Sequence, residues 1–512
     1  SRILGLGRDM LVTAVFGVES IASAFYTAFT LPNLFRRLLG EGALTAALVP
    51  TLNEELKERQ RAGAFALVNQ VASWLFVVSG SIVGVGMALL WLLPRLAGTA
   101  TGWGVDGQTV RRWIDAADLG VILFPYLVGV CLAAAFSAAL QTLNRFLEPA
   151  LSPIWLNIAM ITLLAGAAYG GWAATTEGAM LWLCAGALGG GLLQMLVPAV
   201  ALVRQGWRPR FDLSMGGSFR QIMRLMGPTL FGSAIYLINI SVSRVVGLSL
   251  NDSAVAVLNL ATRLMELPIG VFTVAVSTVV FPLIARHAAA GDWQQLAVSY
   301  RKGMRLILVI NVPAAVGLMI LATPIIRVLF ERGAFAAGAT AAMRPVLVAF
   351  AFGLPFLSFV NIVLRAFYAQ KDTTTPVRAA LLSFGVNLGL SLVLMVPWGT
   401  VGLAIASNCA IVTQAVYLQT HLARKRKSLA FHHVARDLAK VIVSAILMGA
   451  VVGAGWWAWG QRAPTGKWVD ALGLAVLIGL GVLVYGGLVW ALKIEGREDL
   501  AAVVDKVRAK FG

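Results

Sequence analysis

The sequence predicts an all-α polytopic membrane protein with about fourteen transmembrane helices. Hydrophobic residues fill 59% of the 512 positions and charged residues only 12%, whereas soluble domains carry about 25% charged residues. The mean hydropathy of +0.82 describes the whole chain, so the apolar character is not confined to a single anchor. The 41 basic residues are also distributed unevenly between alternate loops, as positive-inside topology requires. These observations exclude soluble, disordered and disulfide-scaffolded classes of protein.

Apolar segments follow one another along the chain, separated by charged or Gly/Pro-rich breaks. A helix needs about 20 apolar residues to cross roughly 30 Å of hydrocarbon, and the first segment is short for a full crossing. The stretch from Lys493 onward alternates in charge, so we expect it to form a surface helix. The expected spans are 1–17, 20–52, 65–94, 113–143, 147–169, 178–203, 221–249, 253–285, 303–330, 343–364, 376–396, 400–422, 438–459 and 469–492.

A weak internal repeat suggests how these spans are grouped. The residues around Pro32 in the second span resemble those around Pro268 in the eighth, six spans later. Two six-helix lobes in a pseudo-twofold arrangement, related by a parallel repeat, are therefore expected. The last two spans lie outside the repeat and carry no charge until their ends, so they could cover a lipid-facing groove. We predict an N-terminal lobe at 1–204, a C-terminal lobe at 205–425, and two C-terminal helices with a cytoplasmic tail at 426–512.

The basic residues predict the orientation in the membrane. One set of alternate loops holds 26 Lys and Arg residues and the opposite set holds 7. Because basic residues collect in cytoplasmic loops, both termini should be cytoplasmic. The richer set comprises 53–64, 144–146, 204–220, 286–305, 365–378, 423–440 and the tail from 493.

The other eight basic residues lie within or beside the spans, and all are arginines. Only Asp9, Glu41 and Glu266 supply negative charge in the same zone. A mid-span Arg costs about 2.5–3.5 kcal/mol, so it must face a hydrated cavity, pair with an acid or reach the surface. Arg224 and Arg327 lie near span ends and are interpreted as surface-reaching anchors. The full set is Arg2, Arg8, Arg36, Arg37, Arg224, Arg244, Arg263 and Arg327.

Some of these arginines are candidates for a functional chamber. Guanidinium groups grip planar oxyanions, phosphate above all, through paired hydrogen bonds. The hypothesis is a hydrated, cationic cavity that binds a phosphate-bearing substrate; the competing interpretation is structural pairing and surface anchoring throughout. The candidate substrate-binding residues are Arg2, Arg8, Arg36 and Arg263, with Asp9 and Glu266 orienting them.

Helix-breaking residues coincide with the same charged spans. Gly5 and Gly7 interrupt the first span, Pro32 and Gly42 the second, and Pro268 the eighth. Broken helices are tolerated where the backbone lines a cavity, and they supply hinges. We therefore predict Pro32, Gly42 and Pro268 as hinges.

The motifs around these residues resemble the MurJ/MviN lipid II flippases of the MOP transporter superfamily. The resemblance covers essentially the whole chain and the fourteen-span layout. The matching segments are SRILGLGRD at 1–9, AFTLPNLFRR at 28–37, EGA at 41–43, GP at 227–228 and RLMELPIG at 263–270.

The resemblance implies a bacterial inner-membrane flippase without enzymatic activity. Its substrate would be lipid II, the undecaprenyl-pyrophosphate-linked disaccharide pentapeptide of peptidoglycan, moved to the outer leaflet by alternating access. Arginines matching Arg2, Arg8, Arg36 and Arg263 would line the central cavity beside an acid matching Asp9. The two added helices would form a groove for the lipid tail. Membrane lipids and the cell-wall synthesis machinery are the other expected partners.

Two departures from the family pattern concern ions. Some members carry an acid in the second span where this chain has Ser23. Some bind sodium through an Asp in the seventh span, whereas this chain has Ser243 beside Arg244. Without a carboxylate sodium should bind poorly, so we expect no cofactor or metal, and membrane potential is the alternative driving force. The other positions matching the sodium site are Asn387, Ser391 and Ser407.

Several other functions are alternatives to a lipid II flippase. The basic run Arg424–Lys427 is assigned to topology first and to anionic lipid second, and no nucleic-acid partner is expected because no aromatic residues interleave with it. An exporter of another lipid-linked oligosaccharide is the nearest alternative. A multidrug antiporter would need acidic residues in its chamber to bind cationic drugs, and the surplus of arginines argues against this function. A glycan polymerase would need an outer carboxylate constellation that the chain lacks, and a scaffold would not explain buried arginines.

Overall fold

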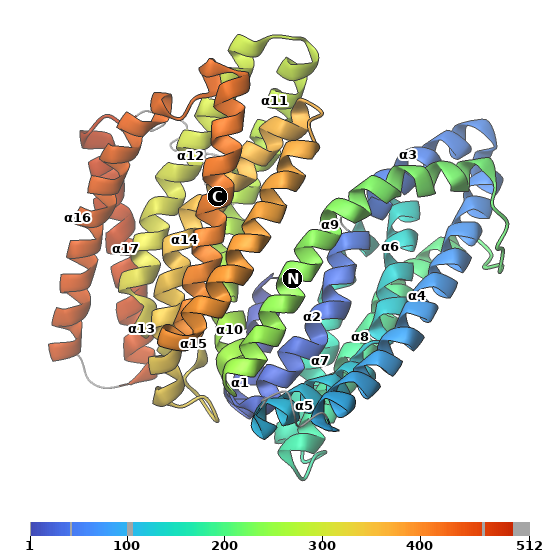
Figure 1. The fold of residues 1–512 in the computed structure, drawn as a ribbon, viewed down its shortest axis with the longest axis horizontal. Coiled ribbons are helices and arrows are strands. Elements are labelled where there is room, and N and C mark those ends of the chain that lie inside the picture. The colour runs from blue at the N-terminus through green and yellow to red at the C-terminus, as the bar shows by residue number, and fades with distance from the viewer. Residues whose placement is uncertain (1, 41–42, 100–105, 463–465, 495–512) are drawn as a thin grey trace. The chain divides into compact units, whose positions relative to one another are not determined.

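Helices connected by short loops, and no strands, make up the residues that the computed structural model of the protein describes, which are 2–40, 43–99, 106–462 and 466–494 (Figure 1). The all-α class is therefore confirmed for this part of the chain. The chain forms two compact units. We call Ser1–Ala256 with Arg332–Phe335 the N-terminal unit, and Val257–Glu331 with Ala336–Gly512 the C-terminal unit.

In the residues that the structure describes, nine helices build the N-terminal unit. Its packing depends on small residues, because membrane helices associate closely where side chains are small. A Cβ added at Gly186 would lie 2.8 Å from Cα of Met160, so α8 approaches the backbone of α7 directly. The helices are α1 (Arg2–Phe16), α2 (Ser20–Gly40), α3 (Ala43–Glu58), α4 (Gln60–Thr99), α5 (Gly107–Leu123), α6 (Tyr126–Thr142), α7 (Leu147–Tyr169), α8 (Thr176–Arg204) and α9 (Gly217–Leu250).

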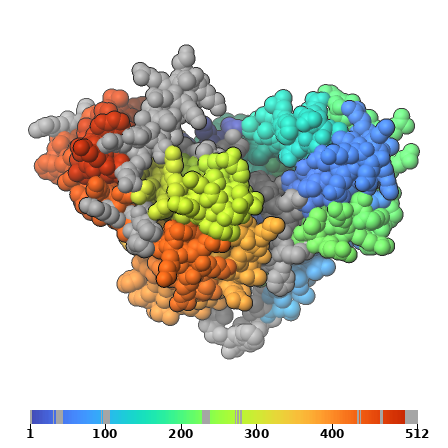
Figure 2. Space-filling model, turned by 90° about the horizontal axis from the view of Figure 1, so that it is seen from above, coloured from blue at the N-terminus to red at the C-terminus, as the bar shows by residue number. Residues whose placement is uncertain are grey.

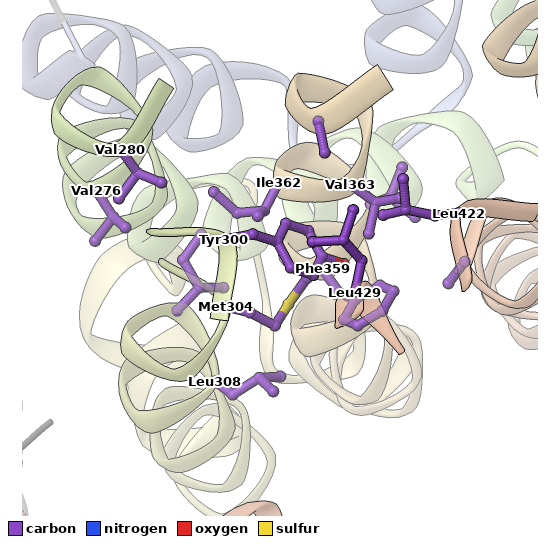
Figure 3. Packing of buried hydrophobic residues seen from close by; sticks show 14 of the residues in the cluster. Val276, Val280, Tyr300, Met304, Leu308, Phe359, Ile362, Val363, Leu422 and Leu429 are labelled. Carbon is purple, nitrogen blue, oxygen red and sulfur yellow. The ribbon is translucent and has the colours of Figure 1, made fainter. Parts of the chain in front are cut away.

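The C-terminal unit is also built of helices in the residues that the structure describes. Its core joins α11, α12, α14, α15 and α16, and Figure 3 shows Tyr300, Met304 and Phe359 within it. The Tyr300 hydroxyl donates to Oε1 of Gln419 at 2.8 Å, which satisfies this polar group in an apolar interior. The elements are α10 (Ala254–Pro268), the π-helix η2 (Ile269–Thr273), α11 (Val274–Ala289), α12 (Trp293–Ile320), α13 (Ala322–Phe330), α14 (Ala337–Ala369), α15 (Thr374–Lys425), the 3-10 turn η3 (Lys427–Leu429), α16 (His432–Arg462) and α17 (Lys467–Ala491).

All fourteen expected spans correspond to helices in the described residues, but fourteen membrane crossings are not confirmed. Eight helices are long and apolar enough to cross a membrane, or nine with α5–α6, a pair bent by 44°. The helix α15 contains two of the expected spans, joined across Gly399 at φ +54°. The expected spans that fall short are the first, second, seventh and eighth. Arg8 lies in the first of these spans and Arg263 in the eighth.

The helix breaks agree only partly with the predicted ones. Gly5 and Gly7 lie inside a continuous α1, which ends at Gly17 with φ +63°. Pro32 lies inside α2, which continues to Gly40, so it does not end the helix as its residue type suggests. Gly42 lies outside the described residues. Pro268, in contrast, ends α10 and is followed by the π-helix.

The ends of several helices in the C-terminal unit meet at one surface. In Figure 2 the yellow-green start of α12 lies beside the orange end of α15. The guanidinium of Arg426 lies 3.3 Å from the centre of the Trp293 ring, which joins these two ends. The division into lobes at residues 204 and 425 stays a prediction, and the tail beyond Ile494 lies outside the described residues.

Candidate functional site

Arg8 and Asp9 form a buried ion pair on α1. The Arg8 guanidinium donates to one oxygen of Asp9 through Nε at 3.1 Å and through Nη2 at 2.7 Å. Its side chain is 9% exposed, and that of Asp9 is fully buried. A buried guanidinium is tolerated only when its charge is compensated. The acid expected to accompany Arg8 is therefore its direct partner, and the role of both in substrate binding stays a prediction.

The helix α7 supports this pair from the side. Nη1 of Arg8 lies 3.8 Å from Sδ of Met160. Gly186 of α8 lies against the backbone of this same Met160, because a glycine carries no side chain. The contact helps to position the surface of α7 that faces Arg8. One turn earlier on the same face is Asn157. The helices α1 and α7 of one unit thus supply these contacts of the pair.

Asn157 is a polar residue that the sequence analysis did not single out. A Cβ at Gly5 would lie 3.8 Å from Oδ1 of Asn157, so the small residue on α1 faces this amide. Nδ2 of Asn157 donates to the Pro153 carbonyl at 2.9 Å, whereas its buried Oδ1 has no hydrogen-bond partner among the residues described. A single Asn in an apolar run carries no motif, so only its polarity could have signalled it.

Arg263 and Glu266 form a looser pair on α10. Nη1 of Arg263 lies 3.7 Å from Oε2 of Glu266, and their side chains are 30% and 38% exposed. The expected i, i+3 pairing is therefore present. These two residues belong to the C-terminal unit, whereas Arg8 and Asp9 belong to the N-terminal unit. A chamber shared by all four stays a prediction.

Two of the predicted arginines have backbones in helices but side chains outside the described residues. Arg2 begins α1 and Arg36 lies near the end of α2. Their roles in substrate binding stay predictions.

A buried polar network follows the break at Pro268. Proline cannot donate the helical hydrogen bond, and π-turns often occur at functional sites. The π-helix ends at Thr273, whose hydroxyl lies 3.1 Å from the hydroxyl of Ser358 and accepts from Nδ2 of Asn311 at 3.1 Å. These three residues are at most 1% exposed. The network fastens the end of the π-helix to α12 and α14, and a hinge motion at Pro268 stays a prediction.

Ser23 has a structural partner at the start of α10. Its hydroxyl donates to the Asp252 carbonyl at 2.6 Å and accepts from the backbone N–H of Ala256 at 3.2 Å. Nη1 of the buried Arg112 lies 3.5 Å from Oδ1 of Asp252. Ser23 therefore satisfies a helix-start N–H from a distant helix, which no local motif reveals.

The positions that match the family sodium site are occupied by hydroxyl and amide groups with partners. The Ser243 hydroxyl donates to the Asn239 carbonyl at 2.9 Å. Ser407 donates to Oδ1 of Asn387 at 3.3 Å, across the kink in α15, and Ser391 is buried nearby in sequence. Poor sodium binding at these positions stays a prediction.

An apolar groove of about 590 Å³ lies between η2, α12, α16 and α17. Phe272, Pro313, Met448 and Gly481 contribute to its walls. The Tyr485 hydroxyl donates to the Val309 carbonyl at 2.7 Å, which ties α17 to α12 along the groove. The two C-terminal helices therefore do border an apolar groove.

Outside the spans, a carboxylate fastens the turn between α14 and α15. Burial raises the pKa of Asp372, but hydrogen bonds from Lys425, Thr375 and Thr374 outweigh this effect and lower the pKa well below its ordinary value. Asp372 also accepts from the backbone N–H of Thr375 at 3.0 Å. The arrangement shows an ion pair that holds the start and the end of α15 together.

Comparison with known proteins places the chain in a family. The family model of the lipid II flippase MurJ matches residues 12–469. The probable lipid II flippase MurJ of Haemophilus influenzae is 34% identical, over 97% of this chain and 98% of its own length. The corresponding protein of Rhizobium tropici is 33% identical, over 88% of this chain and 84% of its own.

Solved structures agree with this placement. A lipid II flippase MurJ in an inward closed conformation is 26% identical, with a TM-score of 0.75, covering 98% of this chain and 97% of its own. An inward-facing multidrug resistance MATE transporter of the MOP superfamily is 15% identical, with a TM-score of 0.63, covering 84% of this chain and 96% of its own; it shares the fold. These likenesses extend over nearly the whole chain, and the protein belongs to the lipid II flippase MurJ family.

Proposed function

We propose that this protein flips lipid II from the cytoplasmic to the outer leaflet of the bacterial inner membrane by alternating access. The observation that carries the proposal is a compensated guanidinium, Arg8 with Asp9, buried in a chain whose residues 12–469 match the MurJ family model. The protein acts as a transporter and not as an enzyme. The family match favours lipid II over the alternative cargo, another lipid-linked oligosaccharide.

The proposed role of the acid is to hold the arginine charge until substrate arrives. Asp9 neutralises Arg8 inside the helix bundle. A pyrophosphate would replace Asp9 by accepting a pair of hydrogen bonds from the planar guanidinium of Arg8. Arg2, Arg36 and Arg263 would supply further cationic contacts, with Glu266 orienting Arg263. Because lipid II brings its own charge, its binding would change the electrostatics of the chamber and favour a change of conformation.

The groove beside α17 supports a place for the polyprenyl tail. It is apolar and bordered by the two helices outside the six-helix repeat. Membrane lipids and the enzymes of cell-wall synthesis are the other proposed partners. The asymmetry of 26 to 7 basic residues supports cytoplasmic termini. We propose membrane potential as the driving force, since the positions matching the sodium site lack a carboxylate.

The test is lipid II flipping by the purified protein in vesicles. Arg36→Ala and Arg263→Ala should each lower the flipping rate at least tenfold, because a charge-assisted hydrogen bond contributes about 1.5–3 kcal/mol. Arg224→Ala is the matched control, since Arg224 is exposed near the start of α9. Normal flipping by both variants, with the control also normal, would reject the arginine chamber. No flipping of lipid II by the unchanged protein would reject the cargo.

A further inference from the structure

A second apolar groove lies in the C-terminal unit, between α12, α14, α15 and α16. Its volume is about 570 Å³, and it shares no lining residue with the groove beside α17. Leu308, Phe356 and Ile442 contribute to its walls, and among the described residues that line it only Gln419 and Thr420 have polar side chains. Gln419 is already engaged with Tyr300 and with the Leu429 carbonyl. The groove therefore suits an apolar chain.

An exposed stripe leads from this groove to the end of α15. Val416 and Thr420 line the groove, and Arg424 follows at the same spacing of four residues. Residues four apart lie on one face of a helix, so Arg424 stands one turn beyond the groove wall. All three side chains are exposed, and that of Val416 is 58% exposed. The groove thus has a guanidinium at the end where α15 stops.

The basic run at this end divides into two pairs with different surroundings. Lys425 is paired with Asp372 and also lies 5.6 Å from the centre of the Phe367 ring. Arg426 stacks on Trp293. Arg424 and Lys427 are exposed and make no ion pair or ring contact with any residue that the structure describes. The middle two residues of the run therefore make contacts within the fold, whereas Arg424 and Lys427 face outward.

We propose that this groove binds one acyl chain of an anionic phospholipid of the cytoplasmic leaflet, with the lipid phosphate at Arg424. The apolar walls match the chain, and the outward-facing guanidinium at the end of the groove matches the phosphate. The assignment to the cytoplasmic leaflet rests on the orientation proposed above, but the site does not depend on the lipid II cargo. The bound chain would fill the space between α16 and the pair α14–α15.

The experiment measures which phospholipid the purified full-length protein retains. The protein in detergent is mixed with equal amounts of dioleoyl phosphatidylglycerol and dioleoyl phosphatidylcholine, which share acyl chains, and bound lipid is counted by native mass spectrometry. We expect preferential retention of phosphatidylglycerol. Arg424→Gln should lower that preference about fivefold, the effect of one basic residue near an anionic lipid. Arg210→Gln, at an exposed arginine of the N-terminal unit, is the matched control and should change nothing.

A second pair of variants tests the acyl chain. Val416→Trp places a large ring over the groove and should reduce retention of both lipids. Val393→Trp is its control, because Val393 is 64% exposed on the same helix but does not line the groove. Both sites are exposed, so the variants should fold, as unchanged melting temperatures would verify.

Three results would overturn the proposal. These are an unchanged lipid preference in Arg424→Gln, an equal loss in Arg210→Gln, or full retention of both lipids in Val416→Trp. Retention is measured without lipid II, so a failure here is distinct from a failure of flipping in vesicles.

Discussion

The two arginine–carboxylate pairs assigned to the same chamber differ sharply in their surroundings. Arg8 reaches one oxygen of Asp9 through two nitrogens, and the pair is almost fully buried. Arg263 approaches Glu266 at 3.7 Å, and both side chains are about one-third exposed. The buried pair therefore contributes to folding as well as to any binding, whereas the exposed pair can rearrange at little cost. A variant of the buried pair can therefore lose flipping because the protein unfolds, whereas a variant of the exposed pair should lose it through substrate binding alone.

The largest effect is expected when the buried pair loses its acid. Asp9→Asn leaves the Arg8 charge uncompensated inside the bundle and should lower the free energy of unfolding by about 3–5 kcal/mol. Chemical unfolding of the purified protein in detergent measures the change. A loss below about 1 kcal/mol would show that the Arg8 charge is hydrated, and the contrast between the two pairs would fail.

Removing both charges of the buried pair should reverse much of this loss. Asp9→Asn combined with Arg8→Met replaces an ion pair with groups that need no charge compensation, so at least half of the stability should return. The same unfolding measurement applies, with flipping expected to stay lost. If the double variant is no more stable than Asp9→Asn alone, Asp9 stabilises the protein through partners other than Arg8.

The ion pair between Asp372 and Lys425, outside the spans, should stabilise the protein to an extent that depends on pH. The pKa of Asp372 is lowered in the folded protein, so its contribution is present above the ordinary carboxyl pKa of about 3.9 and is lost as pH falls below it. Asp372→Asn should cost about 1–3 kcal/mol at pH 7. Melting curves from pH 7 to pH 3 should show this difference narrowing below about pH 4. A constant difference would contradict the assignment.

The smallest effect on stability is expected at the exposed pair. Glu266→Gln should change the free energy of unfolding by less than about 1 kcal/mol, as exposed ion pairs do. The flipping rate should still fall, because Glu266 is proposed to orient Arg263. Unfolding and vesicle assays on one preparation separate the two effects. A stability loss as large as that of Asp9→Asn would remove the contrast.

Much of the fold follows from local pattern. Apolar runs of span length predicted where helices occur, because a helix needs only its own residues to satisfy its backbone. The break at Pro268 was also predictable, since proline removes a backbone donor. The continuation of α2 through Pro32 was not, because neighbouring helices can compensate for a lost hydrogen bond. The presence of a proline in the sequence does not show whether neighbouring helices compensate for the lost hydrogen bond.

The candidate site was predictable in its charges but not in its contacts. The surplus of arginines over acids identified Arg8 and Arg263 without any coordinates. Their unequal burial depends on the residues packed around each of them; Arg8, for example, lies against Met160, 152 residues along the chain. Asn157 was missed because one polar residue in an apolar run carries no periodic signal. The hydrogen bonds of Ser23 could not be foreseen because their partners lie more than 200 residues away in the chain.

The amino-acid sequence on its own determined that this chain is a helical membrane protein whose spans hold more arginines than acids, because hydropathy and charge are properties of each residue and sum along a segment. Tertiary structure alone decided which guanidinium is compensated by burial against a carboxylate and which basic side chains face outward beside an apolar groove. Those outcomes depend on contacts between residues distant in the chain, and the distance between two side chains is not a property of either residue.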